Sequence, residues 1–204
     1  ADGQAIDSAA QNNLTLYGNA KISSTQSKFG GTSMVFDGTG DYAHTTLSTP
    51  IGTGDYTLEC FVRFNAVAYK GVFQLDATPL SGNAYKGPLV FVYEQNSGFF
   101  WSTMTQSGSD QVLISSVTPS TNTWYHVANV RTNGVVKIFI DGTQIISNFT
   151  DTSDYSAHTS LVVGGFFTTD YLMNGYIDEF RISKTARYTS NFTPPTEPFA
   201  DKGQ

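Results

Sequence analysis

The stretch Gly175-Tyr176-Ile177-Asp178-Glu179-Phe180-Arg181-Ile182-Ser183 decides the fold of this chain. A glycine opens an alternating apolar pattern that is typical of a β-strand, with Tyr176, Phe180 and Ile182 on one face. Asp178 falls on the same face. Because an uncompensated buried charge is too costly, its carboxylate must be hydrogen-bonded, paired or bound to a metal ion. The stretch therefore predicts a strand that closes a β fold, and it supplies a candidate cation ligand.

The clearest strand covers residues 56–64. One of its faces carries a continuous apolar row, which we expect in the core: Tyr56, Leu58, Cys60, Val62 and Phe64. The opposite row consists of Thr57, Glu59, Phe61 and Arg63. Because this second row mixes an acid, an aromatic ring and a base, it is typical of a solvated sheet face.

Strands recur along the rest of the chain, separated by Gly, Pro and Asn loops. Asn133-Gly134 and Asp141-Gly142 follow apolar runs and favour type I′ hairpin turns. No stretch shows the sustained 3.6-residue apolar period of a helix. Strands of this number and spacing predict a sandwich or a barrel. The side chains that we expect to be buried include Phe36, Leu58, Cys60, Val62, Trp124 and Phe180.

Composition narrows the possible partners. The 204 residues carry a formal net charge of −6 and contain no cluster of Lys and Arg, which argues against nucleic acid as a partner. The single cysteine, Cys60, lies in an apolar strand and is expected to be a small buried hydrophobe. No apolar run reaches transmembrane length, so we expect no membrane insertion. The first residues, Ala1-Asp2-Gly3, predict a processed chain or a piece of a longer one.

Four pieces of the chain occur in the order of a known family. Besides the stretch quoted above, with its Ala186-Arg187-Tyr188 and Asn191-Phe192-Thr193-Pro194-Pro195 sequel, they lie at residues 29–38, 56–63 and 124–142. Together they resemble the laminin-G-like domains of the concanavalin A-like lectin/glucanase superfamily. This resemblance implies an all-β, two-sheet antiparallel jelly-roll β-sandwich. The variant is similar to domains of bacterial surface proteins and of bacteriophage structural or tail proteins.

The resemblance spans residues 6–199 as one domain. Residues 1–5 then form a linker or processed N-terminus, and residues 200–204 form a tail.

Catalysis is not expected. Glycoside hydrolysis needs two carboxylates across a cleft, but Glu59 and Glu94 have no acid nearby on their own strands. Asp178 and Glu179 are adjacent and point to opposite faces of a regular strand. The three histidines show no zinc-binding spacing, and no Gly-x-Ser-x-Gly elbow occurs.

The resemblance implies a structural calcium ion that ties the N-terminal strand to the C-terminal one. Its ligands would be Asp178, a carbonyl at Gly38 and the region around Asp7. The alternative is that Asp178 caps nearby backbone amides and that residues 37–41 form a solvated turn.

A glycan site needs a rigid aromatic platform beside hydrogen-bonding groups. The row Glu59, Phe61 and Arg63 has this pattern on a strand that the resemblance places at the concave face. Further candidate aromatic residues are Tyr93 and Trp101 on later strands and Tyr69, Tyr85 and Tyr171 in loops. The alternative is that most of these aromatic side chains belong to the core.

Two functions are therefore expected before the third. The first is a non-catalytic, lectin-like module that binds glycan or cell-surface polysaccharide, outside the cell or on a virion surface, within a phage virion or tail or a bacterial surface assembly. The second is a structural or decoration domain that contacts other protein subunits of a virion or fibre. A polysaccharide-active enzyme ranks last.

Overall fold

A computed structural model describes residues 4–5, 12–76, 87–95, 98–106, 110–115, 117–165 and 171–200. For residues 4, 5, 76, 93–95, 98–106 and 110–114 it describes the backbone. Within these ranges the chain forms sixteen β-strands and no helix, as the sequence predicts. The described residues accordingly offer no helix that could span a membrane.

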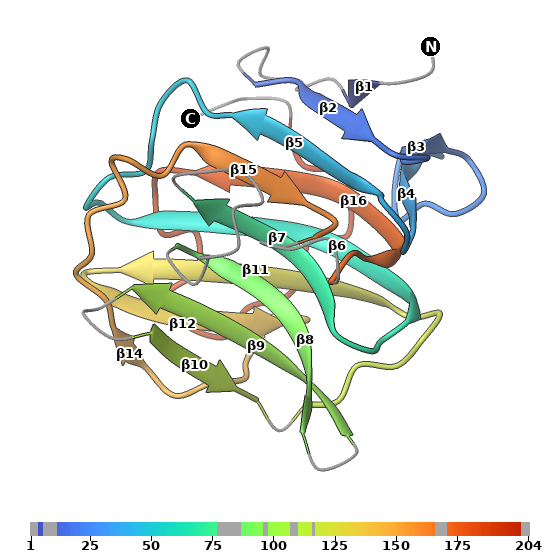
Figure 1. The fold of residues 1–204 in the computed structure, drawn as a ribbon. Helices are drawn as coiled ribbons and strands as arrows, with labels where there is room; N and C mark the ends of the chain where they lie inside the picture. Colours follow the sequence, from blue (N-terminus) through green and yellow to red (C-terminus); the bar gives the residue numbers. More distant parts are fainter. Residues whose placement is uncertain are drawn as a thin grey trace.

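The strands form two antiparallel sheets that pack face to face (Figure 1). The first sheet, which faces the viewer in Figure 1, has the order β1 (Gln4–Ala5), β2 (Leu14–Tyr17), β5 (Tyr42–Thr46), β15 (Ser160–Val163), β7 (Lys70–Asp76), β8 (Leu89–Gln95), β9 (Gly98–Gln106) and β10 (Asp110–Ile114). The second sheet has the order β13 (Thr143–Gln144), β12 (Val135–Ile140), β11 (Trp124–Thr132), β6 (Tyr56–Ala66), β16 (Asn174–Ser183), β4 (Ser33–Asp37) and β3 (Lys21–Ser23), and β14 (Phe149–Thr150) pairs with β12. The predicted two-sheet antiparallel sandwich is confirmed.

The core lies between the sheets and contains the predicted apolar row of β6. Leu58, Cys60 and Val62 are 0% exposed, and Phe36 on the neighbouring β4 is 1% exposed. All four belong to one continuous apolar cluster. Truncating a large side chain in such a core typically costs about 2–5 kcal/mol of stability.

Two side chains predicted in the core are only half-buried. Trp124 begins β11 opposite Arg63, on the face of the second sheet that points away from the core, so its assignment to the core is wrong. Phe180 does pack against the core from its edge, where its ring contacts that of Phe73 at 5.6 Å between centroids.

A β-bulge in β16 changes the face on which Phe180 and Ile182 lie. Asp178 pairs with Phe61 and Arg181 pairs with Glu59, so three steps along β16 match two steps along β6. Glu179 has a φ of 51°, in the left-handed region, as expected where one extra residue is inserted. The prediction that Asp178 shares a face with Phe180 and Ile182 is therefore wrong.

Both predicted hairpin turns are confirmed. Asn133 and Gly134 have φ values of 49° and 72°, and Asp141 and Gly142 have values of 47° and 75°. A type I′ turn requires positive φ at both central residues. At Gly142 the carbonyl oxygen of Phe192 would lie 1.9 Å from an added Cβ, so this turn also needs glycine for close approach of the chain.

Candidate functional site

The row Glu59, Phe61 and Arg63 lies on the outer face of the second sheet, but this face is not solvated. Glu59 is 0% exposed and Phe61 is 2% exposed, so the prediction of a solvated sheet face is wrong. Arg63 stays half-buried, and its Nη1 donates to Oδ1 of Asn65 at 3.1 Å. Its guanidinium lies 5.6 Å from the ring centroid of Tyr176.

The cover is the segment that follows β16, residues 184–199, which we name the C-terminal strap. Its apolar residues Ala186, Tyr188 and Phe192 pack against a small cluster on β11 and β12, formed by Ala128, Val130 and Phe139. The rings of Tyr188 and Phe192 stack at 3.6 Å between centroids. The strap therefore turns an outer sheet face into a second interior.

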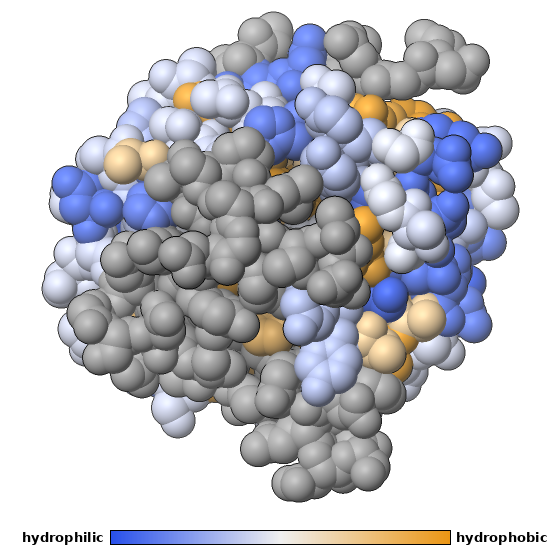
Figure 2. All heavy atoms as spheres, in the orientation of Figure 1, coloured by the Kyte–Doolittle hydropathy of each residue, from blue (hydrophilic) through white to orange (hydrophobic). Residues whose placement is uncertain are grey.

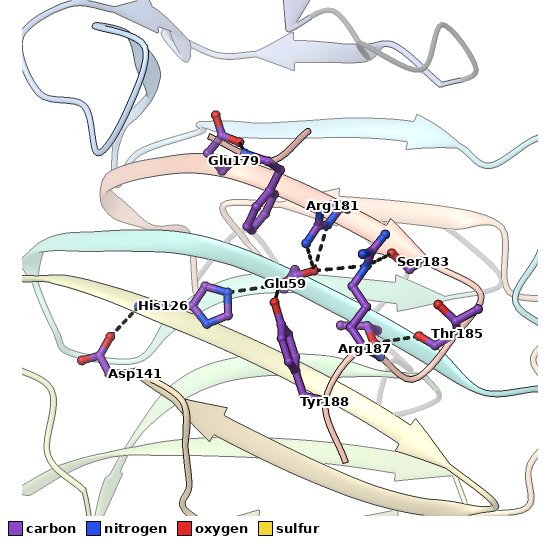
Figure 3. A network of polar contacts seen from close by, with 11 residues as sticks. Glu59, His126, Asp141, Glu179, Arg181, Ser183, Thr185, Arg187 and Tyr188 are labelled. Atoms are coloured by element: carbon purple, nitrogen blue, oxygen red, sulfur yellow. Dashed lines mark hydrogen bonds and ion pairs between the residues drawn. The ribbon is translucent and has the colours of Figure 1, made fainter. Parts of the chain in front are cut away.

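Four polar side chains meet beneath the strap at the carboxylate of Glu59 (Figure 3). Oε1 accepts from Nε of Arg181 at 2.8 Å and lies 2.7 Å from its Nη2. Oε2 accepts from the hydroxyl of Tyr188 at 2.9 Å and lies 3.1 Å from Nε2 of His126. Nε of Arg187 lies 3.6 Å from Oε1. Strands β6, β11 and β16 and the strap thus converge on one carboxylate.

The protonation states follow from these contacts. Burial alone would raise the pKa of Glu59, but the hydrogen bonds from His126 and Arg181 and the charge of Arg181 lower it below its ordinary value. An ionised carboxylate only accepts, so Nε2 of His126 carries the proton of that bond. Burial and the Glu59 carboxylate raise the pKa of Tyr188, which keeps its hydroxyl a donor.

Glu59 and Asp178 form a diagonal pair of carboxylates on neighbouring strands, because Asp178 pairs with Phe61. Pairs of carboxylates perform glycoside hydrolysis when a sugar can enter between them. Here the two residues are 0% and 8% exposed, and protein donors bond both carboxylates. This arrangement joins the strap to the sheet and leaves no access for a substrate.

Asp178 behaves as a cap for backbone amides. Its Oδ2 accepts from the amides of Lys28 and Phe29 at 2.7 and 3.0 Å, and Oδ1 accepts from that of Glu179 at 2.9 Å. These bonds supply the compensation that a buried carboxylate needs.

The residues predicted to hold calcium do not come together. Gly38 lies beside Asn174, and Asp178 lies four residues further along β16, roughly 13 Å away at the spacing of a strand. Calcium ligands lie about 2.5 Å from the ion, so these two cannot share one coordination sphere. Asp7 lies outside the described residues, among which no group of three His, Cys, Asp or Glu side chains could hold a metal ion. Calcium binding stays a prediction.

Other predicted aromatic residues have different outcomes. Tyr93 and Trp101 lie on β8 and β9, but their side chains are outside the described part, and Tyr85 lies outside it altogether. Tyr69 and Tyr171 are brought together, with ring centroids 5.8 Å apart and an interplanar angle of 49°.

This second pair lies where several strands of the first sheet begin or end, at the right-hand side of Figure 1. The end of β2, the start of β5, the end of β15 and the start of β7 meet here. We name this region the tyrosine end, defined by Tyr17, Tyr42, Tyr69 and Tyr171.

Tyr17 and Tyr42 form an exposed aromatic platform at this end. They are direct partners in the β2–β5 ladder, and their rings stack at 4.6 Å with an interplanar angle of 7°. Tyr17 is 40% exposed, while Tyr42 supports it from behind. Burial and then the neighbouring Tyr17 raise the pKa of Tyr42, so its hydroxyl stays protonated at neutral pH.

Polar groups surround the platform. Nδ2 of Asn19, two residues beyond Tyr17, lies 3.4 Å from Oδ2 of Asp37, and both residues are exposed. The buried carboxylate of Asp41 accepts from the amides of Asn19 and Asp37, which fixes the two loops relative to each other. At the neighbouring strand ends, Nδ2 of Asn65 donates to Oδ1 of Asn174 at 3.1 Å.

Sequence reasoning did not find the Tyr17–Tyr42 platform. One signal was present, because Tyr17 occupies a polar position in the alternation Leu14-Thr15-Leu16-Tyr17. Its partner is 25 residues away in sequence, and only the register of β2 against β5 places the two rings together. A single sequence does not reveal that register.

Solved structures share this fold at low sequence identity. Domain 4 of AbnA, a GH43 extracellular arabinanase from Geobacillus stearothermophilus solved with arabinotriose, is 18% identical with a TM-score of 0.61, over 84% of this chain and 81% of that one. A heptameric SAP-like pentraxin from Limulus polyphemus is 15% identical with a TM-score of 0.57, over 91% and 81%. A sialidase from Trypanosoma rangeli is 10% identical with a TM-score of 0.62, over 88% of this chain but 28% of the enzyme. At these identities the likeness establishes the fold alone.

No curated protein matches the chain at a significant level. Residues 37–190, by contrast, match the family described as the concanavalin A-like lectin/glucanases superfamily. That segment covers most of the chain and includes the strands that form the core. The chain therefore belongs to the concanavalin A-like lectin/glucanases superfamily.

Proposed function

We propose that this domain is a non-catalytic carbohydrate-binding module that recognises glycan at the tyrosine end. The observation that carries the proposal is the exposed ring of Tyr17, held flat by the ring of Tyr42 behind it. Sugars present C–H faces and hydroxyl groups, so they bind where a rigid aromatic face lies beside hydrogen-bonding groups. The ladder pairing of the two tyrosines supplies the rigidity before any ligand arrives.

The polar groups at the tyrosine end suit hydroxyl groups. Asn19 has an amide that donates and accepts, and Asp37 has a carboxylate that accepts. Asn65 and Asn174 extend this set along the neighbouring strand ends. Buried Asp41 holds the loops that carry Asn19 and Asp37, so these groups are positioned in advance. Such preorganisation lowers the cost of binding.

The non-catalytic part of the proposal rests on Glu59 and Asp178. Both carboxylates are engaged with protein donors beneath the strap, away from the tyrosine end. A glycoside hydrolase would need such a pair open to a sugar.

A glycan fits the described surface better than a flat protein interface. Figure 2 shows the face of the first sheet, where the described surface is mostly hydrophilic and hydrophobic residues appear in small separate patches. Protein interfaces that build larger assemblies usually need a broader apolar area.

We further propose that the domain acts outside the cell, at a cell surface or on a virion. The arabinanase whose domain 4 shares this fold is extracellular, and that domain was solved with arabinotriose. A surface polysaccharide is the ligand class that such a location offers.

A glycan array followed by calorimetric titration tests the proposal. We expect Tyr17→Ala to weaken binding of an array hit by about tenfold, because an aromatic stacking contact contributes about 1.5 kcal/mol. Tyr17→Phe keeps the ring and should retain binding. Val117→Ala, which removes apolar surface from another exposed position, should change nothing. No binding on the array, or wild-type affinity in Tyr17→Ala, would refute the proposal.

A further inference from the structure

We infer that the tyrosine end binds an extended, uncharged oligosaccharide across two subsites, an inference that rests on the proposed function. One subsite is the Tyr17–Tyr42 platform, and the other is the Tyr69–Tyr171 pair. Both pairs lie at the same end of the sandwich, and a continuous set of residues connects them.

The connection runs through Gly165 and Leu172. A Cβ added to Gly165 would lie 3.8 Å from Cβ of Tyr42 and 2.9 Å from Cδ2 of Leu172, so the chain passes closely between the two. The carbonyl oxygen of Leu172 accepts from Nζ of Lys70 at 3.0 Å, and Lys70 follows Tyr69 in the chain. The amide of Gly71 donates to the carbonyl of Tyr171 at 2.8 Å. Each contact ties one tyrosine pair to the next element along the surface.

The separation of the pairs exceeds one sugar ring. Tyr42 begins β5 and Lys70 begins β7, and β15 lies between these two strands. Two strand spacings amount to about 10 Å. A single monosaccharide therefore occupies one pair at a time, whereas a chain of sugars reaches both.

The backbone of Tyr69 supports a role in binding. Its φ is 40°, in the left-handed region that tyrosine rarely adopts. The other non-glycine residues with positive φ are Asn122, Asn133, Asp141 and Glu179, that is, Asn or Asp side chains, which tolerate the region, and the bulge residue of β16. Strained residues of this kind cluster at ligand sites. Here the conformation goes with a ring that contacts Tyr171.

The charges at this end favour an uncharged ligand. Exposed Asp37 and exposed Lys21 balance each other, and the ammonium group of Lys70 is already bonded to the Leu172 carbonyl. The formal net charge of −6 also disfavours the approach of a polyanion.

The test follows tyrosine ring signals by NMR in the full chain with 13C-labelled tyrosine. The probes are arabinose and arabino-oligosaccharides of two to four units, the corresponding glucose and cello-oligosaccharides, and trigalacturonic acid as a charged comparison. We expect monosaccharides to shift both pairs independently, with two sites per chain. We expect a tetrasaccharide to shift both pairs together with one site per chain and affinity higher on the order of 100-fold, because the second contact becomes intramolecular.

Three variants locate the subsites. Tyr17→Ala and Tyr171→Ala should each return tetrasaccharide affinity to the monosaccharide level. Tyr69→Gly should do the same while leaving the melting temperature near that of the parent, because glycine adopts positive φ without strain. Tyr17→Phe is the matched control and should retain the dependence on chain length.

The outcomes separate the two ideas. Equal affinity for one unit and four, unchanged tetrasaccharide affinity in Tyr171→Ala, or tighter binding of trigalacturonic acid overturns the two-subsite inference and leaves the proposed function standing. No ring shift with any probe, together with an empty glycan array, overturns both.

Discussion

Replacing Glu59 with alanine should loosen the C-terminal strap and destabilise the whole sandwich. The carboxylate accepts from Arg181, Tyr188 and His126, which come from three different segments of the chain. The variant removes the acceptor common to all three. Because the donors then lack their partner beneath the strap, the energetic effect exceeds that of one exposed ion pair.

The expected magnitude follows from burial. Glu59 and His126 are 0% exposed, whereas the side chain of Arg181 is 21% exposed and can recover water. An unsatisfied buried donor costs about 1–3 kcal/mol, and breaking a buried charge pair costs about 3–5 kcal/mol. We therefore expect Glu59→Ala to lower the free energy of unfolding by about 3–5 kcal/mol, which corresponds to roughly 6–20 °C in melting temperature for a chain of this length.

Urea denaturation and native-state hydrogen exchange measure the two parts of this prediction. The amides of residues 184–199 should lose protection earlier in Glu59→Ala than those of β6. Glu197→Gln is the control, because Glu197 is an exposed carboxylate of the same strap. A loss below about 1 kcal/mol, or unchanged protection of the strap, would show that apolar packing alone holds it in place.

Three further outcomes are expected. The lowered pKa of Glu59 means that its stabilisation is present above its ordinary value of 4.5 and lost as pH falls through the folded pKa, so the stability difference between wild type and Glu59→Gln should shrink in acid. Tyr188 has a raised pKa, so its stabilisation is present below its ordinary value of 10.0 and lost as pH rises through the folded pKa; Tyr188→Phe should flatten this alkaline loss. Arg131→Lys should lower the free energy of unfolding by about 3–5 kcal/mol in urea, because the buried guanidinium donates to three backbone carbonyl groups in a geometry that an ammonium cannot reproduce. Asp178→Ala should lower it by about 1–3 kcal/mol through the lost amide cap, and a wild-type melting temperature that EDTA leaves unchanged would refute the predicted calcium ion.

Local patterns in the sequence carried the part of the fold that was predicted correctly. The apolar row of β6 is buried because its period of two matches the pleat of a strand. The Asn133-Gly134 turn forms because those residues tolerate positive φ. Each inference uses residues within a few positions of one another, so neither depends on long-range register.

The burial of Glu59 could not be predicted in the same way. Its partners Arg181 and Tyr188 lie 122 and 129 residues further along the chain. The strand pattern shows two faces of β6, but it does not show that a later segment returns to cover one of them. The bulge at Glu179 adds a second long-range effect, since it exchanges the faces of Phe180 and Ile182.

The strap and the tyrosine end divide the molecule into a part that holds the fold and a part that is proposed to bind. Glu59 and Phe61, which looked like binding residues, stabilise the fold because the strap covers them. Tyr17, which looked like a residue of an edge strand, presents the exposed ring. Because no element is common to the strap contacts of Glu59 and the β2–β5 pairing of Tyr17, substitutions at the two places should add independently. Glu59→Ala should therefore cost stability with little effect on the affinity of the folded fraction, whereas Tyr17→Ala should do the reverse.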